Sequence, residues 1–176
     1  MAKERALFDN LYKVIKVNSG VLDTNDGVFT EIMDLQIPRG WCARIRRVIF
    51  RDHALVEQKP QQNFKLMMAL VMDPDDEEHF QIPTAEIDHD ILCDAEHEYN
   101  RFDFGTEPNG ISVVKPHETL HDFTEELDVV TVRNIRFNTL GSRMDTTLTT
   151  LQTRCIVYFT YEKISIDLYS KLLGIS

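Results

Sequence analysis

The chain has 176 residues, of which 43% are hydrophobic and 27% charged, and its formal net charge is −10 at pH 7. This composition is typical of a globular domain with a hydrophobic core and excludes extensive disorder. The longest apolar run, Leu66–Met72, is far too short to span a bilayer, and the first residues lack the apolar segment of a secretory signal. We therefore expect a protein that is soluble, or at most peripheral to a membrane, and that is not secreted through a signal peptide, with a single domain over residues 1–176.

Acidic and basic residues are segregated along the chain. Residues 73–128 contain eighteen Asp and Glu but only two bases, Arg101 and Lys115, so this segment carries 2 − 18 = −16. The remainder has seventeen Lys and Arg against eleven Asp and Glu, or +6. Such a separation predicts two surfaces of one molecule that face different partners.

Short β-rich segments separated by turn residues dominate the sequence, and long helical periodicity is nearly absent. Most of the second half of residues 63–72 is apolar, which predicts a strand covered on both faces. A short amphipathic helix is expected at the end of the chain, over residues 166–173. In chain order, the expected strands are residues 12–17, 28–37, 41–50, 63–72, 87–93, 98–104, 129–137 and about 147–163.

The strand at residues 41–50 contains a break in its alternation. Trp41, Ala43 and Ile45 share one face, whereas Val48 and Phe50 have the opposite phase. One extra residue near positions 46 and 47 restores the pattern, which predicts a β-bulge there.

About eight strands with loops of variable length favour an all-β fold with Greek-key wiring. The expected architecture is a two-sheet antiparallel sandwich with jelly-roll topology and a short C-terminal helix. Residues 73–128 are expected to form an acidic, loop-rich region of this single domain.

Five arginines occur within thirteen residues of this strand and the turn before it. Arg44 and Arg46 are expected on the face opposite Trp41, where they could neutralise phosphates or pair with acidic residues of a neighbouring subunit. An edge strand protected by charge is the alternative interpretation. The predicted subunit or partner contact consists of Arg39, Arg44, Arg46, Arg47 and Arg51.

The three cysteines are odd in number and lack the Cys-x-x-Cys spacing, which argues against a disulfide framework and a structural zinc site. Cys42 and Cys155 lie in apolar strand patterns and are expected to be buried without a chemical role.

One motif points to catalysis. Residues His117-Glu118-Thr119-Leu120-His121 match the H-E-x-x-H pattern, in which a helix presents two zinc ligands and a general base. The longer form of the motif fails because Thr124 and Leu127 replace its Gly and third His. No catalytic residue, metal or other cofactor is therefore assigned, and a zinc-dependent hydrolase using His117 and His121 remains an alternative.

The order of strands, with a bulged arginine strand after Pro38-Arg39-Gly40, an acidic excursion and a closing run at residues 153–163 before a short helix, resembles the single jelly-roll capsid proteins of icosahedral viruses. The resemblance is architectural. It implies a structural, non-enzymatic subunit of a virion that is assembled in the host cytoplasm.

Copies of the chain and other shell proteins are the partners that this resemblance implies, with an inner membrane or the genome on the basic side and no small-molecule substrate. Residues 1–10 contain only Lys3 and Arg5 as bases, so they lack the long basic arm of many genome-binding capsid subunits. A non-viral β-sandwich binding module is a further alternative, although Trp41 is the only tryptophan available for an exposed aromatic cluster.

Overall fold

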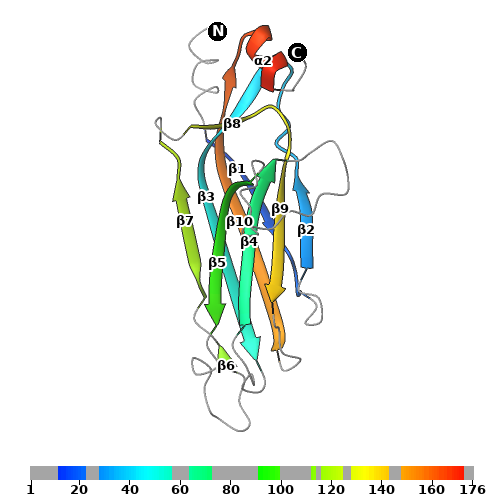
Figure 1. Cartoon of the computed structure of the whole chain (residues 1–176), viewed down its shortest axis with the longest axis vertical. Coiled ribbons are helices and arrows are strands. Elements are labelled where there is room, and N and C mark those ends of the chain that lie inside the picture. The colour runs from blue at the N-terminus through cyan, green and yellow to red at the C-terminus, as the bar shows by residue number, and fades with distance from the viewer. Residues whose placement is uncertain are drawn as a thin grey trace.

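The structure is a computed structural model, and it describes residues 12–22, 28–56, 64–72, 91–99, 112–113, 116–124, 128–142 and 148–172. The described elements are β1 (Lys13–Asn18), β2 (Val28–Met33), β3 (Trp41–Val56), β4 (Phe64–Met72), β5 (Ile91–Tyr99), β6 (Ser112–Val113), β7 (Glu118–Asp122), β8 (Val129–Thr131), β9 (Ile135–Ser142), β10 (Leu148–Lys163) and α2 (Ile166–Leu172), as Figure 1 shows.

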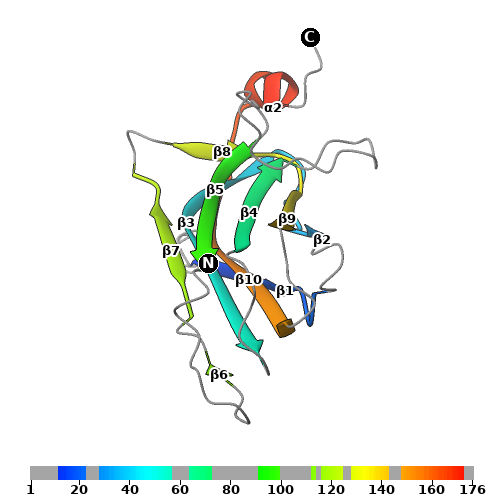
Figure 2. The ribbon, with the colours of Figure 1, turned by 60° about the horizontal axis from the view of Figure 1, so that its bottom comes forward.

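The strands form two antiparallel sheets that pack face to face (Figures 1 and 2). In sheet A, β10 lies between β1 and β3, and the short strands β6, β7 and β8 pair in turn along the other edge of β3. Sheet B has the order β2-β9-β4-β5. With β6, β7 and β8 counted as one interrupted strand, the two orders become 1-8-3-6 and 2-7-4-5, which is the jelly-roll arrangement. The predicted fold class is therefore confirmed.

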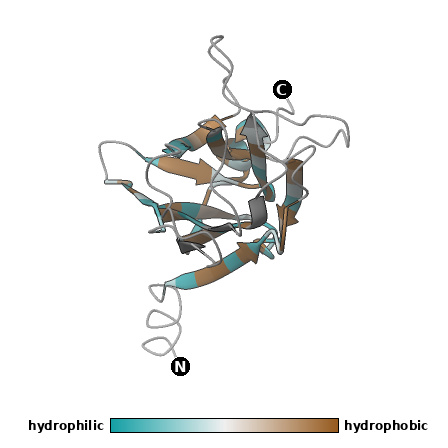
Figure 3. Ribbon diagram, turned by 90° about the horizontal axis from the view of Figure 1, so that it is seen from below, coloured by the Kyte–Doolittle hydropathy of each residue, from teal (hydrophilic) through white to brown (hydrophobic). Residues whose placement is uncertain are grey.

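Side chains from both sheets fill the space between them. The ring of Phe50 in β3 stacks on that of Phe137 in β9, with centroids 6.0 Å apart, and Phe29 of β2 meets Phe137 edge to face. Figure 3, which views the molecule along its long axis, shows hydrophobic segments on strands of both layers. In β4, Ala69 and Val71 are also buried on the opposite face from the core, which confirms that this strand is covered on both sides.

The predicted bulge in β3 is present. Arg47 lies opposite Tyr158 of β10, and the next ladder pair is Ile45 with Phe159, so Arg46 is the extra residue. Because of this insertion, Arg46 and Arg47 are consecutive residues on the same outer face of sheet A, and Val48 returns to the core. β3 continues beyond the predicted end to Val56.

The single strand predicted over residues 129–137 is wrong, because the chain changes sheets within it. β8 pairs with β3 in sheet A, whereas β9 pairs with β4 and β2 in sheet B. Between them the Thr131 hydroxyl donates to the Arg133 carbonyl (2.9 Å), and the side-chain oxygen of Asn134 accepts a hydrogen bond from the Leu35 backbone N–H (3.1 Å). These two hydrogen bonds stabilise the turn between β8 and β9.

The gap predicted between strands at residues 87–93 and 98–104 is also wrong. β5 runs without interruption from Ile91 to Tyr99, while residues 87–90 and 100–104 lie outside the described residues. Asp94, Glu96 and Glu98 are exposed and alternate with buried residues. The acidic residues that suggested a loop therefore form the solvent face of an edge strand.

The short helix predicted at the end of the chain is confirmed as α2. None of its residues is buried, and Ile166 is 81% exposed. Within the described parts of the chain, no helix combines the length and the apolar character needed to cross a membrane.

The three cysteines, Cys42, Cys93 and Cys155, are free and buried, as expected for Cys42 and Cys155. Burial raises the pKa of each thiol. Because the thiolate is the reactive form, we expect the native protein to react very slowly with a thiol reagent such as dithionitrobenzoate at neutral pH, and all three thiols to react after denaturation. A rapid reaction of one thiol in the native protein would contradict this expectation.

Candidate assembly surface and buried polar cluster

Two arginines of β3 face two acidic residues of β7 across the outer face of sheet A. Arg47 lies directly opposite Asp122, and Arg51 directly opposite Glu118. The Arg47 Nε and a terminal nitrogen donate to the two carboxylate oxygens of Asp122 at 2.5 and 3.1 Å, which raises the pKa of Arg47. The Arg51 Nε donates to Glu118. These cross-strand pairs match the observed register of β7 on β3.

Arg44 and Arg46 share a partner on β10. The Glu162 carboxylate lies 2.8 Å from a terminal nitrogen of Arg44 and 3.3 Å from one of Arg46, and Arg44 Nε is 3.1 Å from Asp128. The two arginines therefore project to the same side of sheet A, as the alternation predicted. Arg39 lies in the turn before β3, is exposed, and forms no ion pair with any residue in the described ranges.

At the outer face of sheet A, the separation of charge along the sequence is not kept in space. Glu118, Asp122 and Asp128 belong to the acidic segment, yet in the fold each pairs with an arginine of the basic remainder. This corrects the expectation of two separate charged surfaces for this part of the molecule. Contact between these arginines and a partner molecule stays a prediction. Their acidic partners could not be identified from the sequence because the strands that pair are far apart in the chain.

The outer face of sheet A has an apolar centre between these ion pairs. Leu120 of β7, Ile49 of β3 and Ile156 of β10 lie in one row across the three strands. Ile49 and Ile156 are buried, with 8% and 6% of their surface exposed, so the exposed apolar side chains of this face are Leu120 (49%) and Val14 of β1 (46%). An apolar centre with a charged rim is the usual anatomy of a protein–protein interface.

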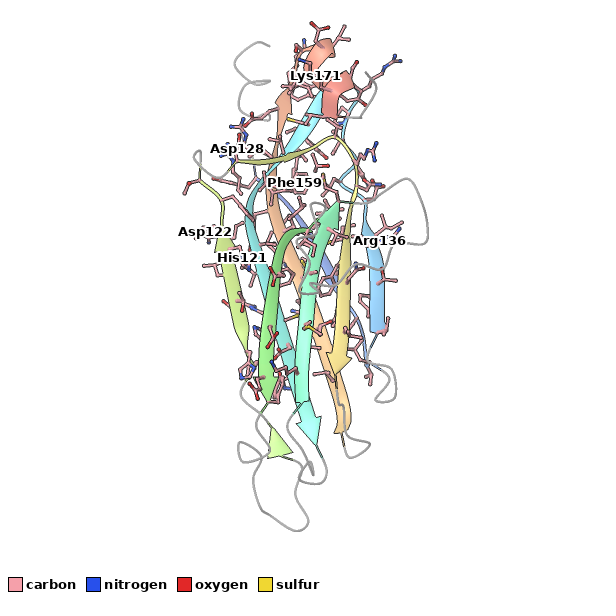
Figure 4. The ribbon with its side chains drawn as sticks, viewed as in Figure 1. His121, Asp122, Asp128, Arg136, Phe159 and Lys171 are labelled. Atoms are coloured by element: carbon pink, nitrogen blue, oxygen red, sulfur yellow. The ribbon has the colours of Figure 1, made fainter. Side chains whose placement is uncertain are left out.

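A groove of about 470 Å³ opens beside this row, at the bulge. Figure 4 shows Asp122 and Asp128 along the same side of the molecule, and Lys171 on α2 at its far end. The groove is lined by Tyr12, Arg46, Arg47, Asp122, Phe123 and Tyr158.

Strand β5, at the edge of sheet B, carries a row of acidic side chains. Asp94, Glu96 and Glu98 project from the solvent face of β5, and Lys65 of β4 pairs with Glu96 at 2.5 Å. Asp94 and Glu98 form no ion pair with any described residue. This row is a compact acidic surface that comes from the segment with a charge of −16.

The ion pair between Arg51 and Glu118 gives a testable coupling between the two strands. Exchanging the two charges (Arg51→Glu with Glu118→Arg) is expected to recover about 0.5 kcal/mol of unfolding free energy relative to the sum of the single variants, as is typical of an exposed pair. Chemical denaturation of the four proteins measures this coupling. A second cycle that combines Arg39→Glu with Glu118→Arg is the control and should be additive, and equal couplings in both cycles would contradict the pairing.

The H-E-x-x-H motif does not form the helix that a zinc hydrolase requires. Glu118–Asp122 is strand β7, so alternate side chains point to opposite sides of the sheet. His117 and His121 are on one side and separated by about 13 Å at the usual rise of a strand, whereas Glu118 is on the other side and pairs with Arg51. His121 Nε2 instead lies 2.8 Å from the Asp94 carbonyl oxygen. The two histidines cannot bind one zinc ion in this structure.

Behind β7, a buried polar cluster joins the two sheets. Asp52 of β3 is 2% exposed, and its carboxylate accepts hydrogen bonds from the Tyr99 hydroxyl and, at 3.2 Å, from the His117 backbone N–H. Its other oxygen contacts His97 Nδ1, and His97 Nε2 lies 2.7 Å from the Thr119 hydroxyl oxygen. Burial and the nearby Asp52 raise the pKa of Tyr99.

The order Thr119–His97–Asp52 is that of a hydrolytic triad, in which a hydroxyl, an imidazole and a carboxylate form a hydrogen-bonded relay. His97 is only 7% exposed. A second cavity, of about 310 Å³, is lined by Asp52, His53 and Pro116, among others, and neither this cavity nor the groove at Arg46 is lined by His97 or Thr119. A substrate therefore has no route to the hydroxyl through these two openings. Sequence reasoning missed the cluster, although Asp52 at an inward position of a strand was a usable signal.

No protein-family model and no curated protein matches the sequence. Among solved structures, the chain aligns with a protein of Desmodium yellow mottle tymovirus, covering 89% of this chain and 93% of that one at 12% identity and a TM-score of 0.40. The alignment with a chain of Turnip yellow mosaic virus covers 90% of this chain and 98% of that one, at 10% identity and a TM-score of 0.35. The alignment with the decameric BFDV capsid protein covers 86% of this chain and 96% of that one, at 10% identity and a TM-score of 0.35.

All three TM-scores are below 0.5, so these alignments carry no argument about this chain. The jelly-roll assignment rests on the strand order of the two sheets.

Proposed function

We propose that this chain is a structural, non-enzymatic subunit of a viral capsid, which assembles with copies of itself into an icosahedral shell. The observation that carries the proposal is the jelly-roll strand order, in which the outer face of sheet A exposes Leu120 and Val14 among charged residues. Closed shells need such faces, because each subunit must bury part of its surface against its neighbours.

Contacts between subunits are proposed to pair the basic residues of one copy with the acidic edge of another. Arg39, Lys16 and Arg154 are exposed and form no ion pair with a described residue of their own chain, and the same holds for Asp94 and Glu98 on β5. A contact between these two surfaces is heterologous and can close into rings or shells. Complementary charge would set its orientation.

The proposed location is the virion, with assembly in the host cytoplasm. Arg44, Arg46, Arg47 and Arg51 remain candidates for contact with a partner, through hydrogen bonds that their intrachain pairs leave free. Other shell proteins and an inner membrane or the genome are the further partners proposed for the basic side.

Sedimentation velocity and negative-stain imaging test the proposal. Between about 0.1 and about 1 M salt the Debye length falls from about 10 to about 3 Å, so contacts between opposite charges should weaken. We expect large particles at low salt and dissociation at high salt. A protein that stays monomeric at high protein concentration and at every salt concentration would overturn the proposal. Particles that form equally at low and high salt concentration would overturn only the proposed electrostatic contacts.

Two single charge-reversal variants test which surface forms the contact between subunits. Arg154→Glu, on the outer face of sheet A, is expected to prevent or strongly weaken assembly. Lys171→Glu makes the same change of charge on α2 (Figure 4) and is expected to assemble as the wild type does. Equal effects of both variants would show that net charge, and not this surface, controls assembly.

A further inference from the structure

Three side chains with metal-ligating atoms meet in the buried polar cluster. Asp52 comes from β3, His97 from β5, and His117 from the segment just before β7. One ligand atom from each lies within 4.8 Å of the others. Asp52 and His97 are buried and His117 is half-buried, so the three groups converge inside the protein and not on a solvated acidic surface.

The remaining polar side-chain atoms of Asp52 and His97 are already held by neighbours. While one Asp52 oxygen faces His97, the other accepts from the Tyr99 hydroxyl and the His117 backbone N–H. His97 Nε2 contacts the Thr119 hydroxyl at 2.7 Å, which leaves Nδ1 directed at Asp52. Outer partners of this kind orient the ligands of metal sites and fix the tautomer of a ligating histidine.

His117 supplies an independent observation. Its Nδ1 is buried and has no hydrogen-bond partner among the described residues, although buried polar atoms are nearly always partnered. The ring instead packs against His97, with centroids 5.2 Å apart, and against Tyr99, with centroids 4.7 Å apart. An ion between the three residues would satisfy this orphaned nitrogen.

We infer that Asp52, His97 and His117 form a binding site for one divalent transition-metal ion of the zinc class. Two imidazole nitrogens and one carboxylate are typical ligands of Zn²⁺ and Co²⁺, whereas Ca²⁺ and Mg²⁺ prefer oxygen alone. A fourth position would be left for water. This inference goes beyond the proposed capsid function and does not depend on it, and it uses only one residue of the H-E-x-x-H motif.

Binding requires a small rearrangement of His97 and Asp52. Ligand atoms at about 2.0 to 2.2 Å from a tetrahedral ion are about 3.3 Å apart, so His97 and Asp52 must separate from their present hydrogen bond. A neutral His97 binds the ion through Nδ1 as the tautomer with its hydrogen on Nε2, and this N–H can donate to the Thr119 hydroxyl. The cavity of about 310 Å³ lined by Asp52, His53 and Pro116, among others, reaches the site at Asp52 alone, because neither His97 nor His117 lines it.

The site would join the two sheets, because β3 and β7 belong to sheet A and β5 belongs to sheet B. Binding to the folded state alone stabilises that state in proportion to the logarithm of the free ion concentration. Zn²⁺ is therefore expected to raise the melting temperature of the protein, and Mg²⁺ is not.

The experiment uses the full chain after removal of metal with a chelator. Isothermal titration with Zn²⁺ is expected to give one site per chain, and Co²⁺ is expected to give the visible absorption of a four-coordinate ion. His117→Ala should abolish saturable binding. It is a suitable variant because its ring forms no hydrogen bond to any residue that the structure describes, so the metal-free protein should still fold, as circular dichroism will check.

Two further variants distinguish binding at this site from binding elsewhere on the chain. His121→Ala changes the other histidine of the motif and should bind Zn²⁺ as the wild type does, whereas Thr119→Ala, which removes the outer partner of His97, should bind about 10-fold more weakly. The inference is overturned if the wild type shows no saturable binding up to millimolar Zn²⁺, if His117→Ala still binds, or if binding is lost in His121→Ala. If metal-free His117→Ala does not fold, the Co²⁺ spectrum and the Thr119→Ala affinity decide instead.

Discussion

Replacing Asp52 with alanine is expected to lower the free energy of unfolding by about 3 to 5 kcal/mol. The carboxylate accepts hydrogen bonds from the Tyr99 hydroxyl and the His117 backbone N–H, and it contacts His97. Without it, these groups lose the hydrogen bonds to Asp52, and a buried group that is left unsatisfied costs about 1 to 3 kcal/mol. Because the cluster connects both sheets, the loss should also weaken their packing against each other.

Urea denaturation of the metal-free protein measures this effect. Asp52→Asn is the matched control, because the amide keeps an oxygen acceptor and nearly the same volume while it introduces a donor and loses the negative charge. We expect an intermediate loss of stability for this variant. A loss below about 1 kcal/mol for Asp52→Ala would mean that water or a rearranged side chain replaces the carboxylate.

The second large effect is expected for Phe137→Ala, which should lower the free energy of unfolding by about 3 to 5 kcal/mol. Phe137 is fully buried in β9, where its ring contacts those of Phe50 and Phe29. Truncation removes apolar surface from the core and leaves a cavity between the sheets, whose backbone cannot collapse to fill it.

Thermal or chemical unfolding of Phe137→Ala should be compared with that of Phe123→Ala. Phe123 follows β7 and is only partly buried at the groove, so its truncation is expected to cost clearly less. Equal losses for the two variants would contradict the central position of Phe137 in the core.

Much of the fold could be predicted from the sequence because its signals are local. Turn residues 38–40 marked the start of β3, the change of phase after Ile45 marked the bulge, and the β-branched and aromatic residues of 148–163 marked β10. The two-sheet sandwich and its jelly-roll wiring followed from the number of strands and their loops. The extent of the single domain, residues 1–176, stays a prediction.

The errors have a common physical cause, which is contact between distant segments. β7 is a strand because it pairs with β3, and a window around His117 contains a helical pattern that this pairing overrides. The acidic residues of β5 suggested a loop because the pairing of β5 with the buried strand β4 is a contact between distant segments. Arg51 with Glu118, and Asp52 with His97, are neighbours only in the folded chain. Composition alone therefore suggested a division of charge that the fold removes at the outer face of sheet A and keeps at β5.

The position of β10 in sheet A also constrains how the chain can fold during synthesis. β10 pairs with β1 on one side and with β3 on the other, across separations on the order of a hundred residues, so β1 has no partner in its sheet until residues 148–163 have been made. Sheet A must therefore form after most of the chain has left the ribosome. We expect slow folding, and a nascent chain interrupted before β10 would expose unpaired strand edges that promote aggregation.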